Sequence, residues 1–376
     1  MYEPIPGNVM FRSLKDRGAI ILAANARTTA GVAKGIFRAA KDLDSAVIFE
    51  IARSECNLDR GYTGLLPGDY AAHIGKAAEE VQFDIWALHA DHITVKKGDA
   101  EDIAGTKKLI DAQIEAGFTS FAIDASHLFN FQGGNLREEL ALNIDVTTEL
   151  AKYIEERMAG KPFGLEVEVG EIGREGEHGK VVTTPEEAVT FVRALNENGV
   201  KPDVLAIANG TAHGNVYDEH GNMIEQVSID IEQTRNIALA LRENNLDVRI
   251  AQHGITGTPR ELINTIFPKG DIIKGNVATF WQNMVLDTFK VYHPELYDDI
   301  YNWTLDNYKE KNPGKADNEI FGKNVKHAIK VFYDKIYGVP KETMDTIEAL
   351  AYAEARVFYR CFSSQGTASI VREAMG

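Results

Sequence analysis

The chain alternates eight times between a short apolar run and a longer stretch whose apolar residues recur at helical spacing. The short runs are continuously apolar rather than alternating, which is typical of parallel strands covered on both faces. Strand–helix alternation repeated eight times predicts an α/β fold and favours a (β/α)₈ TIM barrel over a doubly wound open sheet. The predicted strands lie at residues 19–26, 46–52, 85–92, 118–126, 164–173, 204–214, 248–257 and 271–279.

The stretches between the strands predict amphipathic helices. Pro185 and Pro259 each follow a threonine, and an N-cap hydroxyl followed by proline commonly opens a helix. Beyond about residue 285 the strand-like runs stop; residues 294–319 are polar and turn-rich, and helical patterns cover 324–336 and 341–373. We therefore expect a barrel domain over residues 1–285 and a helical extension over 286–376 packed on it. The barrel helices are predicted at 28–44, 67–81, 100–116, 136–158, 184–198, 229–244 and 258–266.

Charge and cysteine content narrow the functional class. The 376 residues carry a formal net charge of −16, which argues against binding to nucleic acid or to an anionic membrane. No stretch approaches the ~18 apolar residues of a membrane helix, and the N-terminal residues lack the apolar core of a signal peptide. Cys56 and Cys361 are far apart, so neither a disulfide framework nor a cysteine-based zinc site is expected. These features predict a cytoplasmic protein.

Polar residues gather where the predicted strands end. Three of the strand ends carry a histidine, namely His92, His213 and His253, and neighbouring strand ends carry carboxylates such as Glu168. In a closed parallel barrel these ends meet at one mouth, where barrel enzymes place their catalytic groups. A single such histidine is more often a structural residue, but three at equivalent positions predict a catalytic zinc site with one open position. Another divalent cation would also suit these ligands.

Two further features belong to the same end of the predicted barrel. Glycine-bearing turns follow several strands, as at Gly214, Gly254 and Gly275, and their backbone N–H groups can approach an anion closely. We expect these turns, together with Lys274 and nearby hydroxyls, to hold a phosphate. The segment 170–179 is glycine-rich and polar, and it is read equally well as a solvated loop or as a lid carrying a general base.

Six motifs in this order resemble the class II, metal-dependent ketose-bisphosphate aldolases. LHADH (88–92) resembles the family's strand ending in Asp-His, IDASH (123–127) its next strand, and EVEVGEIGREGE (166–177) its Glu-x-Glu-x-Gly lid segment. ANGTAHG (208–214) resembles its Gly-x-x-His-Gly motif, QHGITG (252–257) its His-Gly-Gly-Ser-Gly turn, and KGNVAT (274–279) its phosphate strand. A weaker likeness at 356–371 resembles the C-terminal helix of the longer subclass.

The resemblance implies a role for each matching residue. His92, His213 and His253 would hold the zinc ion, and Glu168 and Asp124 would serve a second metal position or a monovalent cation. Asp91 would carry the proton of the hydroxyl at the cleaved carbon–carbon bond, and a lid glutamate, Glu175 or Glu177, would exchange the proton on the donor carbon. Arg356 would reach a neighbouring subunit and bind the distal phosphate, which implies a homodimer or a higher homo-oligomer. The residues expected to bind the phosphorylated sugar are Asn25, Gly214, Gly254, Thr256, Lys274, Asn276, Thr279 and Arg356.

Several positions depart from the family pattern. Ala278 and Phe280 replace two carboxylates of Asn-x-Asp-Thr-Asp, Ile255 replaces a glycine, and Ala52-Arg53 replaces a Ser-Asn pair. The resemblance thus implies zinc-dependent cleavage of fructose 1,6-bisphosphate, in glycolysis or gluconeogenesis, with an altered aldehyde pocket. Cleavage of another ketose phosphate such as tagatose 1,6-bisphosphate and a non-catalytic barrel subunit are the alternatives. A barrel metallohydrolase is disfavoured, because residues 19–26 lack its paired histidines.

Overall fold

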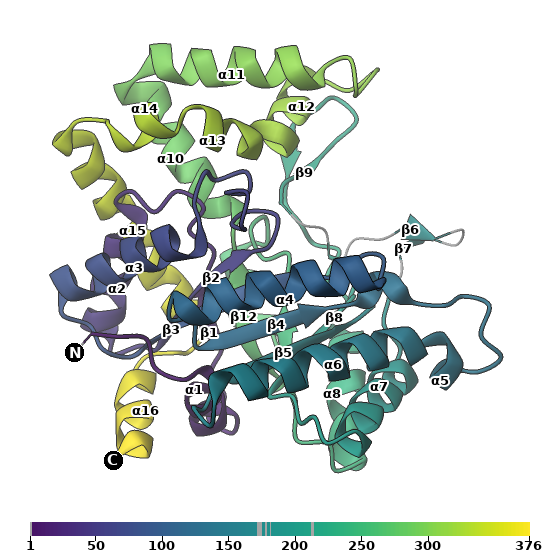
Figure 1. The fold of residues 1–376 in the computed structure, drawn as a ribbon. Helices are drawn as coiled ribbons and strands as arrows, with labels where there is room; N and C mark the ends of the chain where they lie inside the picture. Colours follow the sequence, from purple (N-terminus) through teal and green to yellow (C-terminus); the bar gives the residue numbers. More distant parts are fainter. Residues whose placement is uncertain (1, 171–174, 177–178, 181, 212–213) are drawn as a thin grey trace.

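The computed structural model describes residues 2–170, 175–176, 179–180, 182–211 and 214–376. Eight parallel strands close into a barrel in the order β1-β12-β11-β8-β5-β4-β3-β2. Each strand coincides with one of the predicted apolar runs, so the predicted (β/α)₈ barrel is confirmed (Figure 1). The strands are β1 (Ile21–Ala24), β2 (Val47–Ala52), β3 (Trp86–Thr94), β4 (Ser120–Asp124), β5 (Gly164–Val169), β8 (Val204–Ile207), β11 (Arg249–Gln252) and β12 (Ile272–Val277).

The barrel strands are buried on both faces, as their continuous apolar character requires. Every residue of β2, β5 and β12 is buried, including those that point into the barrel. Helix α1 (Gly7–Leu14) precedes the first strand and contacts β5 and β3. The helices between the strands are α2 (Val32–Leu43), α3 (Pro67–Val81), α4 (Ala100–Glu115), η1 (Ser126–Leu128), α5 (Leu136–Glu139), α6 (Ala141–Met158), α7 (Pro185–Glu197), α8 (Ile231–Glu243) and α9 (Arg260–Ile266).

The two predicted proline starts differ in the structure. At α7 the Thr184 hydroxyl accepts a hydrogen bond from the backbone N–H of Glu187 at 3.1 Å, and Pro185 is the first helical residue, as predicted. At α9 the N-cap residue is Pro259 itself, and the buried Thr258 hydroxyl makes no such bond. The Thr-Pro pattern therefore marks both helix starts, but only the first has the predicted hydroxyl cap.

Helices follow the barrel to the end of the chain. Figure 1 shows α10 leading out of the barrel to a group formed by α11, α12, α13 and α14, after which α15 returns beside α2. The predicted domain boundary at residues 285 and 286 falls inside α10, and the division into two domains stays a prediction. The helices are α10 (Thr279–Tyr292), α11 (Pro294–Tyr308), α12 (Asp317–Asn324), η2 (Val325–His327), α13 (Ala328–Val331), α14 (Tyr333–Tyr337), α15 (Lys341–Cys361) and α16 (Thr367–Met375).

The turn-rich prediction for residues 294–319 is wrong over most of its length. Helix α11 occupies Pro294–Tyr308, with its proline in the first turn, where proline favours a helix. Ile300 of this helix is buried, and Tyr297 and Trp303 pack against the core at helical spacing. Tertiary burial of that face thus stabilises a segment whose polar composition suggested a loop.

Short antiparallel strand pairs lie outside the barrel. β6 (Glu175–Gly176) pairs with β7 (Gly179–Lys180) in the predicted lid segment, and β9 (Val216–Tyr217) pairs with β10 (Met223–Ile224). Within the described part of the chain, no helix is both long and apolar enough to cross a membrane.

Candidate active site

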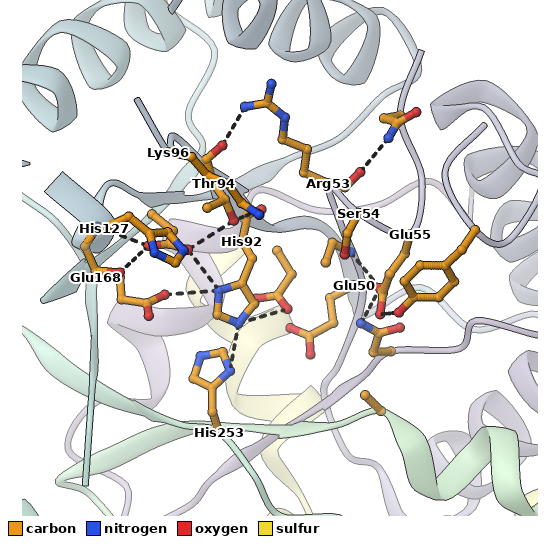
Figure 2. A pocket seen from close by; sticks show the side chains of 18 of the residues that line it. Glu50, Arg53, Ser54, Glu55, His92, Thr94, Lys96, His127, Glu168 and His253 are labelled. Carbon is orange, nitrogen blue, oxygen red and sulfur yellow. Dashed lines mark hydrogen bonds and ion pairs between the residues drawn. The ribbon is translucent and has the colours of Figure 1, made fainter. Parts of the chain in front are cut away.

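A cavity of about 1010 Å³ opens at the C-terminal ends of the barrel strands. Its wall is formed by strand ends, by the loops that follow them, and by one residue of the extension, Lys326. Figure 2 shows His92 near the middle of the labelled side chains, with Glu168 and His253 beside it and Glu50 and Glu55 to one side. The cavity therefore occupies the mouth at which the sequence predicted the functional residues to meet.

His92 and His253 lie side by side although 161 positions separate them. His92 Nε2 is 3.2 Å from His253 Nδ1, and Asp91 Oδ2 is 3.9 Å from the same His92 nitrogen. Each of these three residues offers one ligand atom, and the three atoms lie within 4.8 Å of one another, a spacing that suits a metal ion. The predicted third histidine, His213, lies outside the described residues.

A backbone irregularity sets the orientation of His92. The β3–β4 register shifts between Ala90 and Ile93, and His92 has φ of +38°, which is unusual for a residue with a Cβ. A bulge re-aims side chains that strict alternation would send to opposite faces of a strand. Asp91 and His92 are consecutive, yet both line the cavity, and the bulge accounts for this.

The other nitrogen of His92 faces two carboxylates. His92 Nδ1 is 3.1 Å from Glu168 Oε2 and 3.6 Å from Asp124 Oδ2, and these three residues form a second group with ligand spacing. Burial and the neighbouring Asp124 raise the pKa of Glu168 to about 8, although His92 opposes this. Burial disfavours a charged His92, but Asp91 and Glu168 raise its pKa well above the usual range. Imidazoles crowded by buried carboxylates form a donor set that suits a divalent cation.

A layer of buried charge lies beneath these groups. Lys274 is fully buried, and its Nζ lies 2.6 Å from Glu166 Oε2, 3.1 Å from Glu50 Oε2 and 3.0 Å from His89 Nε2. Burial opposes the ammonium, but Glu166 and Glu50 raise the pKa of Lys274 above its usual range. This position does not support the predicted phosphate contact, because Lys274 lies two residues before Asn276 on β12 and so points into the barrel one layer deeper.

Asp91 links the two layers. Its Oδ1 is 3.6 Å from Lys274 Nζ and 3.4 Å from Asn276 Nδ2. Burial alone would raise the pKa of Asp91, but His92, Lys274 and His253 lower it to about 2. Asp91 is thus a buried carboxylate at neutral pH that remains in the cavity wall, as a proton acceptor requires.

Most of the residues predicted to bind the sugar phosphate line this cavity. The backbone of Gly214 has φ of +82° and that of Gly254 has φ of +70°, both in the region that favours glycine. Arg356 instead lies on α15, where its Nη1 is 2.9 Å from the Tyr352 hydroxyl and 3.6 Å from Asp42 Oδ2. The predicted residues in the wall are Asn25, Gly214, Gly254, Thr256, Asn276 and Thr279.

The predicted lid glutamates are only partly described. The backbone of Glu175 belongs to β6, and Glu177 lies outside the described residues. Their part in proton exchange stays a prediction.

The departures from the family motifs have different surroundings. Phe280 packs its ring against Trp281 and Phe358, with the Arg260 guanidinium 4.7 Å from the ring centroid. Its place is therefore in the contact between α10 and α15. Ala52, Ile255 and Ala278 line the cavity, so these departures alter its wall.

A polar cluster in the cavity wall near β1 and β2 was not predicted from the sequence. Glu55 accepts hydrogen bonds from Asn25 Nδ2 at 2.6 Å, from Arg27 Nε at 2.7 Å and from the Tyr62 hydroxyl at 2.7 Å. Lys326 contributes to the same cavity from η2. Arg27 follows Asn25 by two positions and could have been considered, but nothing local in the sequence relates Lys326 to the barrel mouth.

The fold and the site together define a (β/α)₈ barrel with a candidate divalent-metal centre at its mouth. A sequence model of the family described as fructose-bisphosphate aldolase class-II matches residues 7–336. The chain therefore belongs to the class-II fructose-bisphosphate aldolase family, a family of metal-dependent aldehyde-lyases.

Curated relatives are 26–29% identical to the chain over the aligned residues. It is 29% identical over 251 residues to the fructose-bisphosphate aldolase class 2 of Synechocystis sp., a match that covers 63% of this chain and 61% of that protein. It is 26% identical over 237 residues to the fructose-bisphosphate aldolase of Giardia intestinalis, covering 62% and 59%. The chain thus spans about three fifths of the length of these relatives.

Solved structures share the fold at low identity. The fructose-bisphosphate aldolase of Campylobacter jejuni superposes with a TM-score of 0.62 at 18% identity, covering 97% of each chain. A probable tagatose 6 phosphate kinase from Sinorhizobium meliloti 1021 gives 0.62 at 17%, covering 95% of this chain and 98% of the other. A fructuronate-tagaturonate epimerase from Cohnella laeviribosi gives 0.58 at 11%, covering 94% and 81%. These likenesses concern the fold alone.

Proposed function

We propose that the protein is a zinc-dependent aldolase that reversibly cleaves fructose 1,6-bisphosphate into dihydroxyacetone phosphate and glyceraldehyde 3-phosphate, in glycolysis or gluconeogenesis. The observation that carries this proposal is the meeting of His92, His253 and the carboxylates Asp91 and Glu168 in one cavity of a class-II family member. His92, His253 and His213 are the proposed zinc ligands, and Glu168 and Asp124 serve a second metal or a monovalent cation. When bound, a divalent cation polarises a ketone carbonyl as a Lewis acid.

The chain's own residues carry the proton transfers. Asp91 accepts the proton of the hydroxyl next to the breaking carbon–carbon bond and returns it in the condensation direction. Its low pKa keeps it unprotonated for the cleavage step. A lid glutamate, Glu175 or Glu177, exchanges the proton on the donor carbon. Lys274 holds positive charge beneath Asp91 and serves as a positioning residue rather than a phosphate ligand.

The backbone turns and short side chains of the mouth bind the donor phosphate in this proposal. Gly214 and Gly254 allow backbone N–H groups to approach the anion, and Thr256, Asn276 and Thr279 supply hydroxyl and amide groups from the same side. Ala52, Ile255 and Ala278 depart from the family motifs and line the cavity, so they alter the surface that contacts the substrate. For this reason tagatose 1,6-bisphosphate is the second candidate substrate.

A cleavage assay with and without chelator tests the activity. We expect purified protein to cleave fructose 1,6-bisphosphate, to lose cleavage in excess chelator, and to regain it with Zn²⁺ or another divalent cation. His253→Ala should bind less zinc and lose activity, whereas His220→Ala, whose side chain is 75% exposed, should behave like the wild type. Absence of cleavage with zinc and any of the ketose phosphates would contradict the proposal and favour a non-catalytic subunit.

Two properties of the whole protein belong to the same proposal. We infer a homodimer or a higher homo-oligomer in which Arg356 reaches a neighbouring subunit, and sedimentation showing only the 41.5 kDa chain at micromolar concentration would contradict it. We also infer a reducing, cytoplasmic location, since Cys56 and Cys361 are both buried and unbonded.

A further inference from the structure

A positively charged part of the cavity wall lies beside the end of β1. It contains Arg27, which follows β1, and Lys326, which lies in η2 of the extension. The Tyr62 ring contacts both, with the Arg27 guanidinium 5.7 Å and Lys326 Nζ 5.6 Å from its centroid. His327 packs edge-on against the same ring with centroids 5.3 Å apart. Tyr62 therefore joins the extension to the barrel mouth at this wall.

The two cations differ in how their charge is balanced. Arg27 Nε is 2.7 Å from Glu55 Oε1, and the Arg27 side chain is only 12% exposed, so this cation already has a carboxylate. Lys326 has no carboxylate within ion-pair distance among the described residues, although it is half-buried. Burial and the nearby Arg27 lower its pKa, with Glu55 opposing the shift. An anion bound in the cavity would supply the negatively charged partner that Lys326 lacks among the described residues.

The position of this wall relative to the proposed donor-phosphate turns is set by the order of the strands. Gly214 follows β8, Gly254 and Thr256 follow β11, and Thr279 follows β12, and these three strands are neighbours in the barrel. β1 and β2 come next after β12 in that order. Arg27 Nη1 is 3.2 Å from Thr279 Oγ1, so the two walls adjoin. An extended ligand anchored by one anionic end at the turns can thus present its other end to Lys326.

We propose that Lys326 binds the terminal anionic group on the aldehyde half of the substrate, with Arg27 and Tyr62 completing the subsite. The helical extension thereby selects doubly anionic ketose phosphates from within the same chain. This inference rests on the proposed function for its substrate class, but it makes a separate claim about which residue provides the distal charge.

Binding of unreactive ligands tests the claim without turnover. Hexitol 1-phosphate and hexitol 1,6-bisphosphate lack the ketone that cleavage needs, and calorimetry on the zinc-loaded protein gives a Kd for each. We expect the wild type to prefer the bisphosphate at least about tenfold, since an ion pair with a partly desolvated lysine supplies an affinity gain of this order. Lys326→Met should reduce the preference to within about threefold, and Lys326→Arg should restore part of it.

Lys323→Met is the matched control. Lys323 lies three residues earlier in the extension, its side chain is 53% exposed, and it pairs with Glu319 at 2.7 Å. It should keep the preference of the wild type. Equal binding of the two hexitols by the wild type, or an unchanged preference in Lys326→Met, would overturn the inference. Loss of the preference in Arg356→Met alone would assign the distal charge to Arg356 instead.

Kinetics separate this inference from the proposed function. The kcat/KM for fructose 1,6-bisphosphate should be about ten- to hundredfold lower in Lys326→Met than in the wild type, while the kcat/KM for fructose 1-phosphate should stay unchanged. An equal loss with both substrates would indicate a structural effect and contradict the inference. A wild type that binds the hexitol bisphosphate preferentially but cleaves no ketose phosphate would retain the subsite and refute the aldolase activity.

Discussion

Asp91 shows how single side chains at the barrel mouth depend on those beneath them. Its carboxylate faces His92 on one side, and Lys274 and Asn276 on the other. A buried carboxylate is costly unless it is paired, and Lys274 supplies part of that pairing while it also lies within ion-pair distance of Glu166 and Glu50. Asp91 is therefore both held in place and kept ionised. A carboxylate at this position can act as a metal ligand or as a proton acceptor.

Asp91→Asn separates these two roles at the residue scale. The amide keeps the size of the side chain but cannot accept the hydroxyl proton, so kcat should fall about 10²- to 10⁴-fold. Zinc content, measured by plasma mass spectrometry, should stay at the wild-type level because His92 and His253 remain. Loss of the bound zinc together with activity would show that Asp91 is a ligand and that the assigned proton role is wrong.

Helix α2 of the barrel and helix α15 of the extension pack closely against each other. A Cβ added at Gly35 would lie 2.3 Å from the backbone oxygen of Glu348 and 2.7 Å from Ala351 Cβ, both on α15. Only a residue without a side chain allows the two helices to pack at this distance. The extension thus packs on the barrel through a close helix–helix contact at Gly35 and through buried apolar side chains.

Gly35→Ala tests this contact at the element scale. Alanine favours a helix over glycine by about 1 kcal/mol, but the clash with α15 backbone should outweigh this and lower the free energy of unfolding by about 1–3 kcal/mol. The matched control is Gly75→Ala in α3, where an added Cβ has no atom within 4 Å. Denaturant unfolding should show the control to be neutral or stabilised, and equal stability of the two variants would contradict the packing argument.

Helix α16 packs against α1 and is also linked to the barrel by a cluster of ion pairs. Arg372 Nη2 is 2.7 Å from Asp84 Oδ1, and Arg372 Nη1 is 2.8 Å from Asp44 Oδ1. Hydrogen bonding to Arg372 lowers the pKa of Asp84 despite partial burial. Burial acts to raise the pKa of Asp44, but hydrogen bonds from Ser369 and Arg372 lower it overall. One cation thus ties the last helix to two loops of the barrel.

The pH dependence of stability tests this cluster at the scale of the whole molecule. Because both carboxyl pKa values are lower in the folded state, their contribution is present above the unfolded value of about 3.9 and is lost as pH falls through the folded values. Arg372→Met should lower the free energy of unfolding at pH 7 by about 1 kcal/mol or less, since all three side chains are more than one third exposed. Denaturation at a series of pH values should show this difference shrinking below about pH 4. A difference that is constant with pH would exclude the ion-pair explanation.

The sequence alone determined the barrel and the kind of chemistry at its mouth. Continuous apolar runs, helical spacing and the Thr184-Pro185 start are local signals, because burial on both faces, the 3.6-residue period and capping involve neighbours along the chain. The same reasoning placed Asn25, Asp91, His92 and His253 at strand ends, since parallel strands in a barrel end at one mouth. It failed at α11, where burial against distant segments outweighed a polar composition.

Only the tertiary structure decided the depth and the partners of each side chain. Lys274 and Asn276 look equivalent in the sequence, yet a step of two residues moves one from the cavity wall to the layer of Glu166 and His89 below it. Glu55 accepts hydrogen bonds from Arg27 and Tyr62. Lys326 lines the same cavity although it belongs to the extension, because folding brings together segments about 300 positions apart in the sequence. Contacts between residues so far apart depend on tertiary packing, and no local pattern in the sequence predicts them.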